Sequence, residues 1–224
     1  SSTYGNNGTC QGMGVGCSYV AGRYGSALLF NGSTALVNVS NTGSLNNLGP
    51  VTWSMWVNRN SLTNYGALMY KSDNNVDAGW WIDFRSDNGG ELGTNIVHST
   101  TNIRRYTNAS ILGVGQWFHL VITWTNVSSY DAVKIYINGV EAAYSWNTTP
   151  AGTHNSDAAE PLTIGWGYGG TGGYFNGSID EVMIWNRNLS VSEISQLYNS
   201  NLYKYSSSNW QFTSNQSNLS VGSY

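Results

Sequence analysis

The stretch that decides the fold runs from Gly177 to Tyr198 and reads GSIDEVMIWNRNLSVSEISQLY. Residues 178–186 are rich in β-branched and aromatic side chains and contain neither glycine nor proline, which predicts a strand. Ser190 and Glu193 have the spacing of a capping box at the start of a helix. The apolar residues that follow at helical spacing are Val191, Ile194, and Leu197 or Tyr198. A helix of about two turns over 190–198 is too short to be stable alone in water, so we expect it to pack on a sheet.

Five shorter motifs precede this stretch, and they are GSALLFNG at 25–32, VTWSMWV at 51–57, QWFHLVITW at 116–124, VKIYING at 133–139 and LTIG at 162–165. In this order they resemble the laminin-G-like, concanavalin-A-like sandwich family, whose domains close with a run similar to 177–198. Only Trp185 departs from that run, where tyrosine is more common. The resemblance covers roughly residues 4–198. It implies an all-β, two-sheet antiparallel jelly-roll sandwich with one short helix near 190–198.

The remaining segments also favour this architecture. The chain reads as about a dozen short strands at hairpin spacing, which is typical of a two-sheet antiparallel sandwich. Asn31-Gly32 and Asn138-Gly139 each lie between two apolar runs. The first pair suits the type I′ turn of a hairpin, and the second is a strong hairpin signal. Residues 1–25 are rich in serine, glycine and asparagine, so we expect a loop there.

The two ends of the chain carry separate expectations. The sandwich is assigned to residues 1–198, and residues 199–224 to a tail with strands at 209–213 and 218–224. By the resemblance, we expect the strand that opens related domains to be missing, because the chain starts too late. Two explanations remain open: a segment cut from a longer multidomain protein, or a tail that adds a strand to a neighbouring module or copy.

Charged residues are unusually scarce. They make up 9% of the chain, against about 25% in ordinary globular proteins. Ten Trp and fifteen Tyr supply ample apolar surface for a core, and the net charge is −3. Because Lys and Arg cluster only at Arg104-Arg105, we expect no nucleic-acid partner. No apolar run approaches the ~20 residues that span a bilayer, so direct membrane insertion is not expected either.

Two cysteines and many glycosylation motifs point to an extracellular or cell-surface setting. Cys10 and Cys17 enclose six residues, three of them glycine, and a disulfide between them is favoured over two free thiols. Chance alone produces several Asn-x-Ser/Thr motifs in a chain of this composition, but some are expected to be modified. The candidate glycosylation sites are Asn7, Asn38, Asn108, Asn126, Asn147, Asn188, Asn215 and Asn218.

The acidic and basic side chains predict no catalytic site. Asp83 has Trp81 and Arg85 as its neighbours on one face of a strand, so it lacks a second carboxylate. The adjacent acids Asp180 and Glu181 should point to opposite sheet faces. The three histidines, among them His119 on an apolar strand, lie in no recognisable nucleophile motif. We therefore expect a protein that is not an enzyme.

The family resemblance also implies structural calcium. Many members hold an ion between the turn after the first hairpin strand and the Ile-Asp-Glu strand, and the matching residues here are Asn31 and Asp180. Relatives usually have aspartate at the first position, so one fewer negative charge should weaken the site. Alternatively, both side chains only stabilise turns.

A carbohydrate site is the third chemical expectation. Aromatic rings near polar loops stack on sugars while nearby polar groups bind the hydroxyls. The residues assigned to carbohydrate binding are Trp80, Asp83, Arg85, Trp146, Tyr168 and Tyr174. The tryptophans assigned to the core are Trp53, Trp117, Trp124 and Trp185. With so many tryptophans, partial exposure of several is also expected without any ligand.

Two functional hypotheses follow. The first is a non-catalytic extracellular module of a surface or appendage protein that acts in adhesion or assembly, including strand exchange between copies in a filament. The second is a carbohydrate-binding, lectin-like module of a polysaccharide-active protein. The partners are other copies or neighbouring domains in the first case and glycans in the second.

Overall fold

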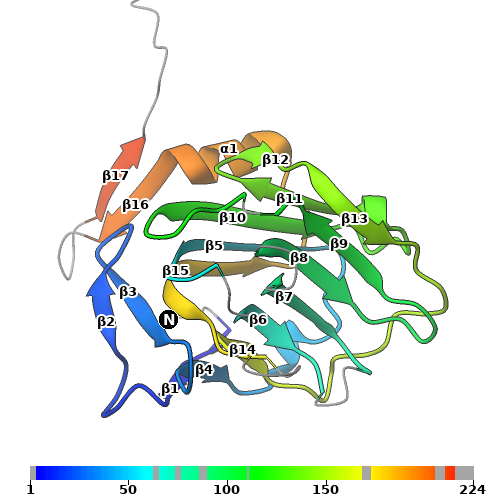
Figure 1. Cartoon of the computed structure of the whole chain (residues 1–224), viewed down its shortest axis with the longest axis horizontal. Coiled ribbons are helices and arrows are strands. Elements are labelled where there is room, and N and C mark those ends of the chain that lie inside the picture. Colours follow the sequence, from blue (N-terminus) through cyan, green and yellow to red (C-terminus); the bar gives the residue numbers. More distant parts are fainter. Residues whose placement is uncertain are drawn as a thin grey trace, which may run out of the picture.

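The structure is a computed structural model that describes residues 4–62, 66–73, 77–85, 90–109, 111–167, 173–204 and 210–214. Two antiparallel sheets face each other in a sandwich, and one helix lies on the outside (Figure 1). The predicted all-β jelly-roll class is therefore confirmed.

Sheet A has eight strands among the described residues. In spatial order they are β1 (Gly8–Gln11), β4 (Leu36–Val39), β14 (Leu162–Ile164), β6 (Gly66–Lys71), β7 (Trp80–Arg85), β8 (Glu91–Ile96), β9 (Ile103–Thr107) and β13 (Tyr144–Thr148). Strands β6 to β9 are consecutive in the chain, and β13 pairs with β9 after the chain has passed through sheet B, so the outer faces of these five strands form one continuous surface.

Sheet B has seven strands in the described part of the chain. In spatial order they are β12 (Val140–Glu141), β11 (Val133–Ile137), β10 (Trp117–Trp124), β5 (Val51–Arg59), β15 (Asn176–Trp185), β3 (Ser26–Asn31) and β2 (Tyr19–Ala21). The strand predicted over 178–186 is thus β15, and it lies near the centre of its sheet. The turn Asn138-Gly139 joins β11 to β12, which confirms the predicted hairpin, and positive φ at both residues suits a type I′ turn.

The core lies between the two sheets. Trp53 of β5 and Trp80 of β7 meet there with ring centroids 4.7 Å apart. Both are almost fully buried, as is Trp124. Aromatic pairs of this kind stabilise a fold by about 0.5–1.5 kcal/mol beyond the area they bury. Trp117 and Trp185, which were also assigned to the core, are only half-buried.

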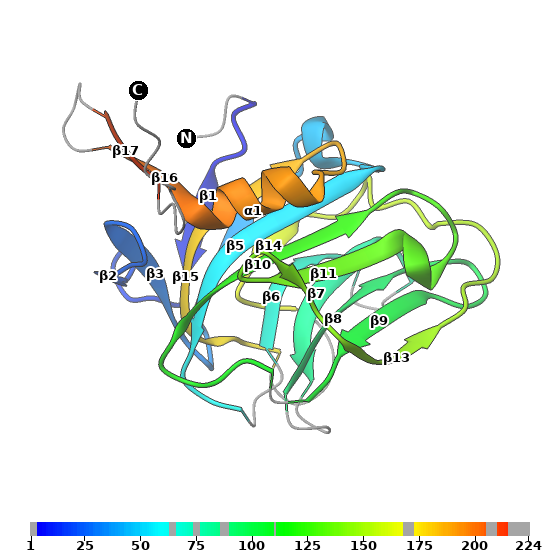
Figure 2. The ribbon, with the colours of Figure 1, turned by 90° about the horizontal axis from the view of Figure 1, so that it is seen from above.

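Helix α1 (Val191–Asn199) covers the outer face of sheet B (Figure 2). The predicted capping box forms: the Ser190 hydroxyl accepts from the Glu193 backbone N–H, and the Glu193 carboxylate accepts from the Ser190 N–H. Ile194 is fully buried and packs with Val121 and Tyr136 of sheet B. The short helix is therefore held by the sheet, as expected.

The predicted hairpin at Asn31-Gly32 is wrong. Strand β3 belongs to sheet B and β4 to sheet A, so this turn carries the chain from one sheet to the other. Only Gly32 has positive φ, whereas a type I′ turn requires it at both residues. The Asn31 side chain instead accepts hydrogen bonds from the backbone N–H groups of Ser33, Thr34 and Ala35.

Residues 1–25 were expected to be loop, but two short strands lie there. Strand β1 pairs with β4 at the edge of sheet A, and β2 pairs with β3 at the edge of sheet B. The disulfide Cys10–Cys17, which confirms the predicted pairing, closes the turn between them. Strands of three or four residues beside exposed glycines leave little sequence pattern, which is why they were missed.

The tail forms a small sheet of its own. Strand β17 (Trp210–Ser214), predicted over 209–213, pairs with β16 (Ser200–Lys204), a strand that the sequence did not predict. The second predicted strand, 218–224, lies outside the described residues. Pairing of the tail with another module or copy remains a prediction.

Candidate functional site

The outer face of sheet A carries the candidate site. Along β7, Trp80, Ile82 and Phe84 point into the core, so the alternate residues point outward. Strand pairing sets these outward residues in two rows that cross the sheet. One row is Tyr70, Trp81, Asn95, Arg104 and Thr148, and the other is Ala67, Asp83, Gly93, Tyr106 and Trp146.

Three side chains at the β13 end form a cluster that we call the platform: Arg85, Tyr106 and Trp146. The rings of Tyr106 and Trp146 are stacked with centroids 5.0 Å apart and planes 7° from parallel. The Arg85 guanidinium lies 5.2 Å from the Tyr106 centroid and 5.1 Å from that of Trp146. Trp146 and Arg85 remain partly exposed, so this surface is both aromatic and cationic.

Gly93 makes room for the platform. A Cβ at this position would lie 2.1 Å from the Tyr106 ring, so the ring can lie over β8 only because residue 93 has no side chain. From there the Tyr106 hydroxyl donates to Asp83 Oδ1 at 3.0 Å. Burial, and then the Asp83 carboxylate, raise the pKa of Tyr106 well above its usual range. The phenol therefore stays neutral and keeps its hydrogen bond at ordinary pH.

The Trp146 ring is held from its other end. Its indole N–H donates to Glu91 Oε2 at 3.2 Å, and the Ser145 hydroxyl donates to Glu91 Oε1 at 2.9 Å. The pairing of β13 with β9 shifts register between Tyr144 and Trp146, so β13 has a bulge at this point. A bulge on an edge strand re-aims the side chains beside it. The platform is thus fixed before any ligand arrives.

A second feature, which we call the hollow, lies on the same face between β6 and β14, and β6 is four strand spacings from β13. It has a volume of about 400 Å3 and is lined by Tyr70, Ser72, Asp73, Glu160, Pro161, Thr163 and Trp166. The Tyr70 ring lies 5.8 Å from that of Trp81 and 6.4 Å from that of Trp166. Tyr174 continues this line of rings, 6.0 Å from Trp166. Aromatic rings, two carboxylates and three hydroxyls, that of Tyr70 included, thus surround one concave space.

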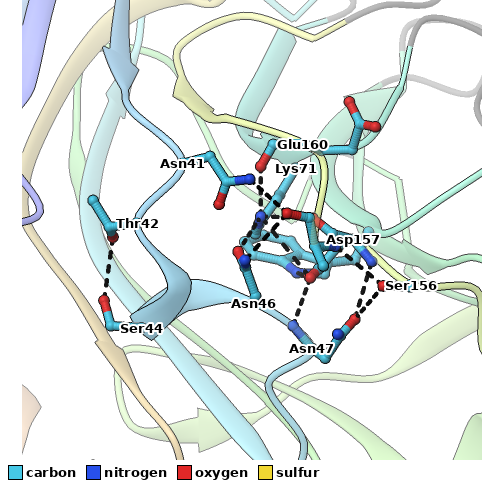
Figure 3. A network of polar contacts seen from close by, with 11 residues as sticks. Asn41, Thr42, Ser44, Asn46, Asn47, Lys71, Ser156, Asp157 and Glu160 are labelled. Carbon is cyan, nitrogen blue, oxygen red and sulfur yellow. Dashed lines mark hydrogen bonds and ion pairs between the residues drawn. The ribbon is translucent and has the colours of Figure 1, made fainter.

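A buried polar network fixes the wall of the hollow (Figure 3). Lys71 is 1% exposed, and its ammonium donates to the backbone carbonyls of Asp157 and Glu160 at 2.8 and 2.5 Å. The Asp157 carboxylate lies 3.9 Å from that ammonium and accepts from Trp80 Nε1 and the Asn47 backbone N–H. Burial lowers the pKa of Lys71, while Asp157 and then Glu160 oppose that shift. The Glu160 side chain points away from Lys71, so it remains available to the hollow.

The predicted carbohydrate residues fall in three places. Asp83, Arg85 and Trp146 come together at the platform, and Tyr174 lies beside Trp166 near the hollow. Tyr168 lies outside the described residues. Trp80 is 2% exposed and belongs to the core, because its side chain points inward like those of Ile82 and Phe84.

Sequence reasoning missed the residues that complete the site. Trp81, next to the chosen Trp80, is the outward ring, and strict alternation along β7 contained that signal. Tyr106 also follows from alternation once β9 is placed beside β8. Tyr70 and Trp166 could not be found in this way, because they come close only through the pairing of β14 with β6.

The residues predicted as calcium ligands lie far apart along the paired strands β3 and β15. Asn31 pairs with Asn176, and Asp180 lies four residues further along β15. At about 3.4 Å per residue the two are roughly 13 Å apart, whereas calcium takes its ligands at about 2.3–2.6 Å. Asp180 is buried, which raises its pKa, and accepts from the Tyr24 and Glu181 backbone N–H groups. In the described part of the chain no three His, Cys, Asp or Glu side chains gather as metal ligands. Calcium binding remains a prediction.

The histidines have structural contacts. His119 is 1% exposed, its Nε2 lies 2.9 Å from the Ser54 hydroxyl oxygen, and burial lowers its pKa to about 4. Ser54 is itself completely buried, so this pair does not face a substrate. His98 and His154 form a backbone bridge with rings 5.8 Å apart.

The candidate glycosylation sites among the described residues differ in exposure. Asn7, Asn108, Asn126 and Asn147 are exposed, while Asn38 and Asn188 are half-buried. Asn215 and Asn218 lie outside the described residues, and modification remains a prediction for all these sites. No described helix is long and apolar enough to cross a membrane.

Comparisons with known proteins agree on the fold. The family model described as the concanavalin A-like lectin/glucanases superfamily matches residues 31–195. Domain 4 of an extracellular GH43 arabinanase from Geobacillus stearothermophilus, solved in complex with arabinotriose, is similar with a TM-score of 0.60 and 23% identity over 83% of this chain and 82% of that one. No curated protein sequence matches the chain.

Two toxin domains are similar as well. The binding domain of Paraclostridial mosquitocidal protein 1 has a TM-score of 0.64 and 20% identity over 83% of this chain and 46% of that one. A structure of botulinum neurotoxin type C, a toxin whose cell entry depends on two ganglioside molecules, has a TM-score of 0.60. Its identity is 17% over 88% of this chain and 47% of that one. The chain thus spans about half the length of each toxin chain. At these identities the likeness concerns the fold alone.

Proposed function

The chain belongs to the concanavalin A-like lectin/glucanase superfamily, and from this premise we propose that it is a non-catalytic, extracellular carbohydrate-binding module whose site is the outer face of sheet A. Because the superfamily name covers both binding and hydrolytic proteins, the proposal rests on the residues of that face.

The observation that carries the proposal is the combination of the platform and the hollow on one face. Sugar rings have apolar faces that stack on aromatic side chains and hydroxyl edges that need polar partners. The platform offers the stacked Trp146 with the Arg85 guanidinium beside it. The hollow offers Trp166 and Tyr70 beside the carboxylates of Asp73 and Glu160. A glycan uses both kinds of group at once.

The rigidity of the site supports the same proposal. Both Trp146 and Tyr106 are held by hydrogen bonds to carboxylates of the same face, Glu91 and Asp83. Side chains that are ordered before binding lose little conformational entropy when the ligand arrives. That arrangement suits recognition of a polar ligand with few strong contacts.

Known proteins of this fold give independent support. The arabinanase domain was solved in complex with arabinotriose. Cell entry of the neurotoxin, of which the match covers 47%, depends on gangliosides. The disulfide Cys10–Cys17 supports an oxidising, extracellular setting.

A glycan array followed by calorimetry tests the proposal. The chain is screened against plant, bacterial and animal glycans, and each hit is titrated into the wild type and into Trp146→Ala and Trp166→Ala. The matched control is Tyr19→Ala, because Tyr19 is a 63% exposed aromatic of sheet B, away from this face. Binding that one of the tryptophan variants weakens and Tyr19→Ala leaves unchanged supports the proposal. Silence across the array, or equal effects in all three variants, contradicts it.

A second function, assembly, is favoured by the tail. Among the described strands, β16 and β17 pair only with each other, and an isolated two-stranded sheet is marginally stable. We propose that this hairpin docks on a neighbouring copy or module, as adhesion and assembly proteins require. Mass photometry over a range of concentrations should show assemblies that Gln211→Pro reduces, because proline removes a ladder hydrogen bond. A monomer at every concentration contradicts this second function.

A further inference from the structure

We infer that the platform and the hollow are the two ends of one binding strip, and that the ligand is an extended linear glycan that crosses the strands. The inference rests on the proposed function and adds to it the length of the ligand and the direction in which it lies. Strand register, the low side chains between the two ends and one unpaired polar atom support it.

Strand register fixes the distance between the two ends. Tyr70 of the hollow lies in the first outward row, on β6, and Trp146 lies in the second row, on β13. The order β6-β7-β8-β9-β13 separates them by four strand spacings. At about 4.8 Å per spacing, and with a shift of two residues along the strand, the path along the sheet is roughly 20 Å. No single sugar ring reaches both ends.

The middle of the strip is low. Strand β8 contributes Asn95, which is 2% exposed, and Gly93, which is covered by the buried Tyr106 ring. The residues on either side of this strand are larger and partly exposed, namely Trp81 of β7 and Arg104 of β9. An extended chain therefore finds a shallow path over β8 between the ring clusters at either end.

A polar atom in this path lacks a partner. Asn95 lies between Trp81 and Arg104 in register, and its Oδ1 is buried without a hydrogen bond among the described residues. Leaving a buried acceptor unpaired costs about 1–3 kcal/mol. A ligand hydroxyl that reaches the floor of the strip supplies the missing donor, which an aromatic or aliphatic ligand does not.

The two ends reinforce each other only in a ligand that contacts both. Once one end is bound, the other contact forms within the same complex at a high effective concentration. Affinity should therefore rise with chain length until the ligand spans the strip and then level off. A glycan recognised at one end alone shows no such dependence.

The test is a length series combined with a double-mutant cycle. The probes are arabino-, xylo- and cello-oligosaccharides from the disaccharide to the octasaccharide, together with size fractions of any other linear glycan that the array selects. Each is titrated by calorimetry into the wild type, Trp146→Ala, Trp166→Ala and the double variant. Trp146→Phe and Trp166→Phe keep an aromatic ring and should restore binding, and thermal melting verifies that every variant folds.

For the longest probe we expect each alanine variant to bind roughly tenfold more weakly, as is common for central aromatic contacts. For the shortest probe that binds, only one of the two should matter. Affinity independent of length, or two tryptophans that both matter for a disaccharide, overturns the strip while the proposed function stands. If no glycan binds at all, the proposed function fails and the strip fails with it.

Discussion

Among single residues, Gly93 has the clearest consequence for the site. Its missing side chain is what allows Tyr106 to reach Asp83 and Trp146 to stack on Tyr106. A glycine at an inner strand position ordinarily weakens a sheet, so its presence here needs a reason such as close approach of a ring. The platform supplies that reason.

Gly93→Ala should therefore displace the Tyr106 ring and disrupt the platform. Overpacking of this kind typically costs about 1–3 kcal/mol of stability. Urea unfolding measures the loss, and near-ultraviolet circular dichroism reports the stacked rings. Gly113→Ala is the matched control, since a Cβ there meets nothing within 4 Å. Equal stability and equal spectra for both variants contradict this role of Gly93.

His119 makes stability depend on pH. Burial lowers its pKa to about 4, below the value of about 6.5 in the unfolded chain. The neutral His119 side chain therefore contributes to the stability of the fold above pH 6.5, and this contribution is lost as the pH falls toward 4. The difference between the pKa values in the folded and unfolded chain corresponds to about 3 kcal/mol of unfolding free energy. Urea unfolding between pH 7 and pH 4 should show that decline, and His119→Gln should flatten it. An unchanged slope in the variant contradicts the assignment.

The choice of Trp80 over Trp81 shows what sequence reasoning achieved at single positions. Alternation with Ile82 and Phe84 already placed Trp80 inside, so this information was present in the sequence. By contrast, the contact of Trp166 with Tyr70 depends on strands far apart in the chain, and no local pattern contains it. Short-range periodicity predicts the face of a residue, while the partner across strands follows only from the fold.

Among elements, the loop that carries Asp157 and Glu160 controls the hollow. Its contacts with Lys71, Trp80 and Asn47 join it to sheet A and to the segment before β5. Because the ion pair between Lys71 and Asp157 is buried, water cannot replace either partner. Its loss should lower both the stability of the chain and its affinity for a glycan.

Asp157→Asn should destabilise the chain by about 2–4 kcal/mol, since it leaves the buried Lys71 without its carboxylate. Asp131→Asn is the matched control. Asp131 pairs with Arg105 at 3.3 Å but is 66% exposed, and exposed pairs contribute about 0–1 kcal/mol. Chemical unfolding compares the two variants. Similar small losses for both would show that the buried network is not needed.

Prediction from sequence worked best for elements with a strong local pattern. Strand β15 and helix α1 were predicted within two residues of their ends, because the apolar spacing and the capping box are local signals. The Asn31-Gly32 turn was misassigned because a crossover between sheets and a hairpin have similar sequences. Only the long-range partners of β3 and β4 distinguish them.

For the whole molecule, the distribution of charge bears on which glycans are bound. The net charge is −3, and two of the described residues lining the hollow are acidic, Asp73 and Glu160, with no basic residue among them. Lys71, next to Tyr70 in the sequence, has its ammonium in the buried network. A carboxylate on the ligand would therefore meet like charge in the hollow.

We expect an oligosaccharide with a uronic acid at the hollow to bind roughly tenfold more weakly than its neutral counterpart, and less so in high salt. The double variant Asp73→Asn/Glu160→Gln should reduce the difference in affinity between the charged and the neutral oligosaccharide. Calorimetry on matched neutral and oxidised oligosaccharides provides the measurement. Equal affinity for both forms in the wild type contradicts the expectation.

Hydrogen–deuterium exchange with and without a bound oligosaccharide tests the central claim most directly, because it reports the binding face without any substitution. The account predicts that the longest binding oligosaccharide slows exchange in β6, β7, β8, β9 and β13, and leaves α1 and the Cys10–Cys17 turn unchanged. Protection confined to sheet B, to α1 or to the disulfide turn would contradict it and place the glycan on another surface.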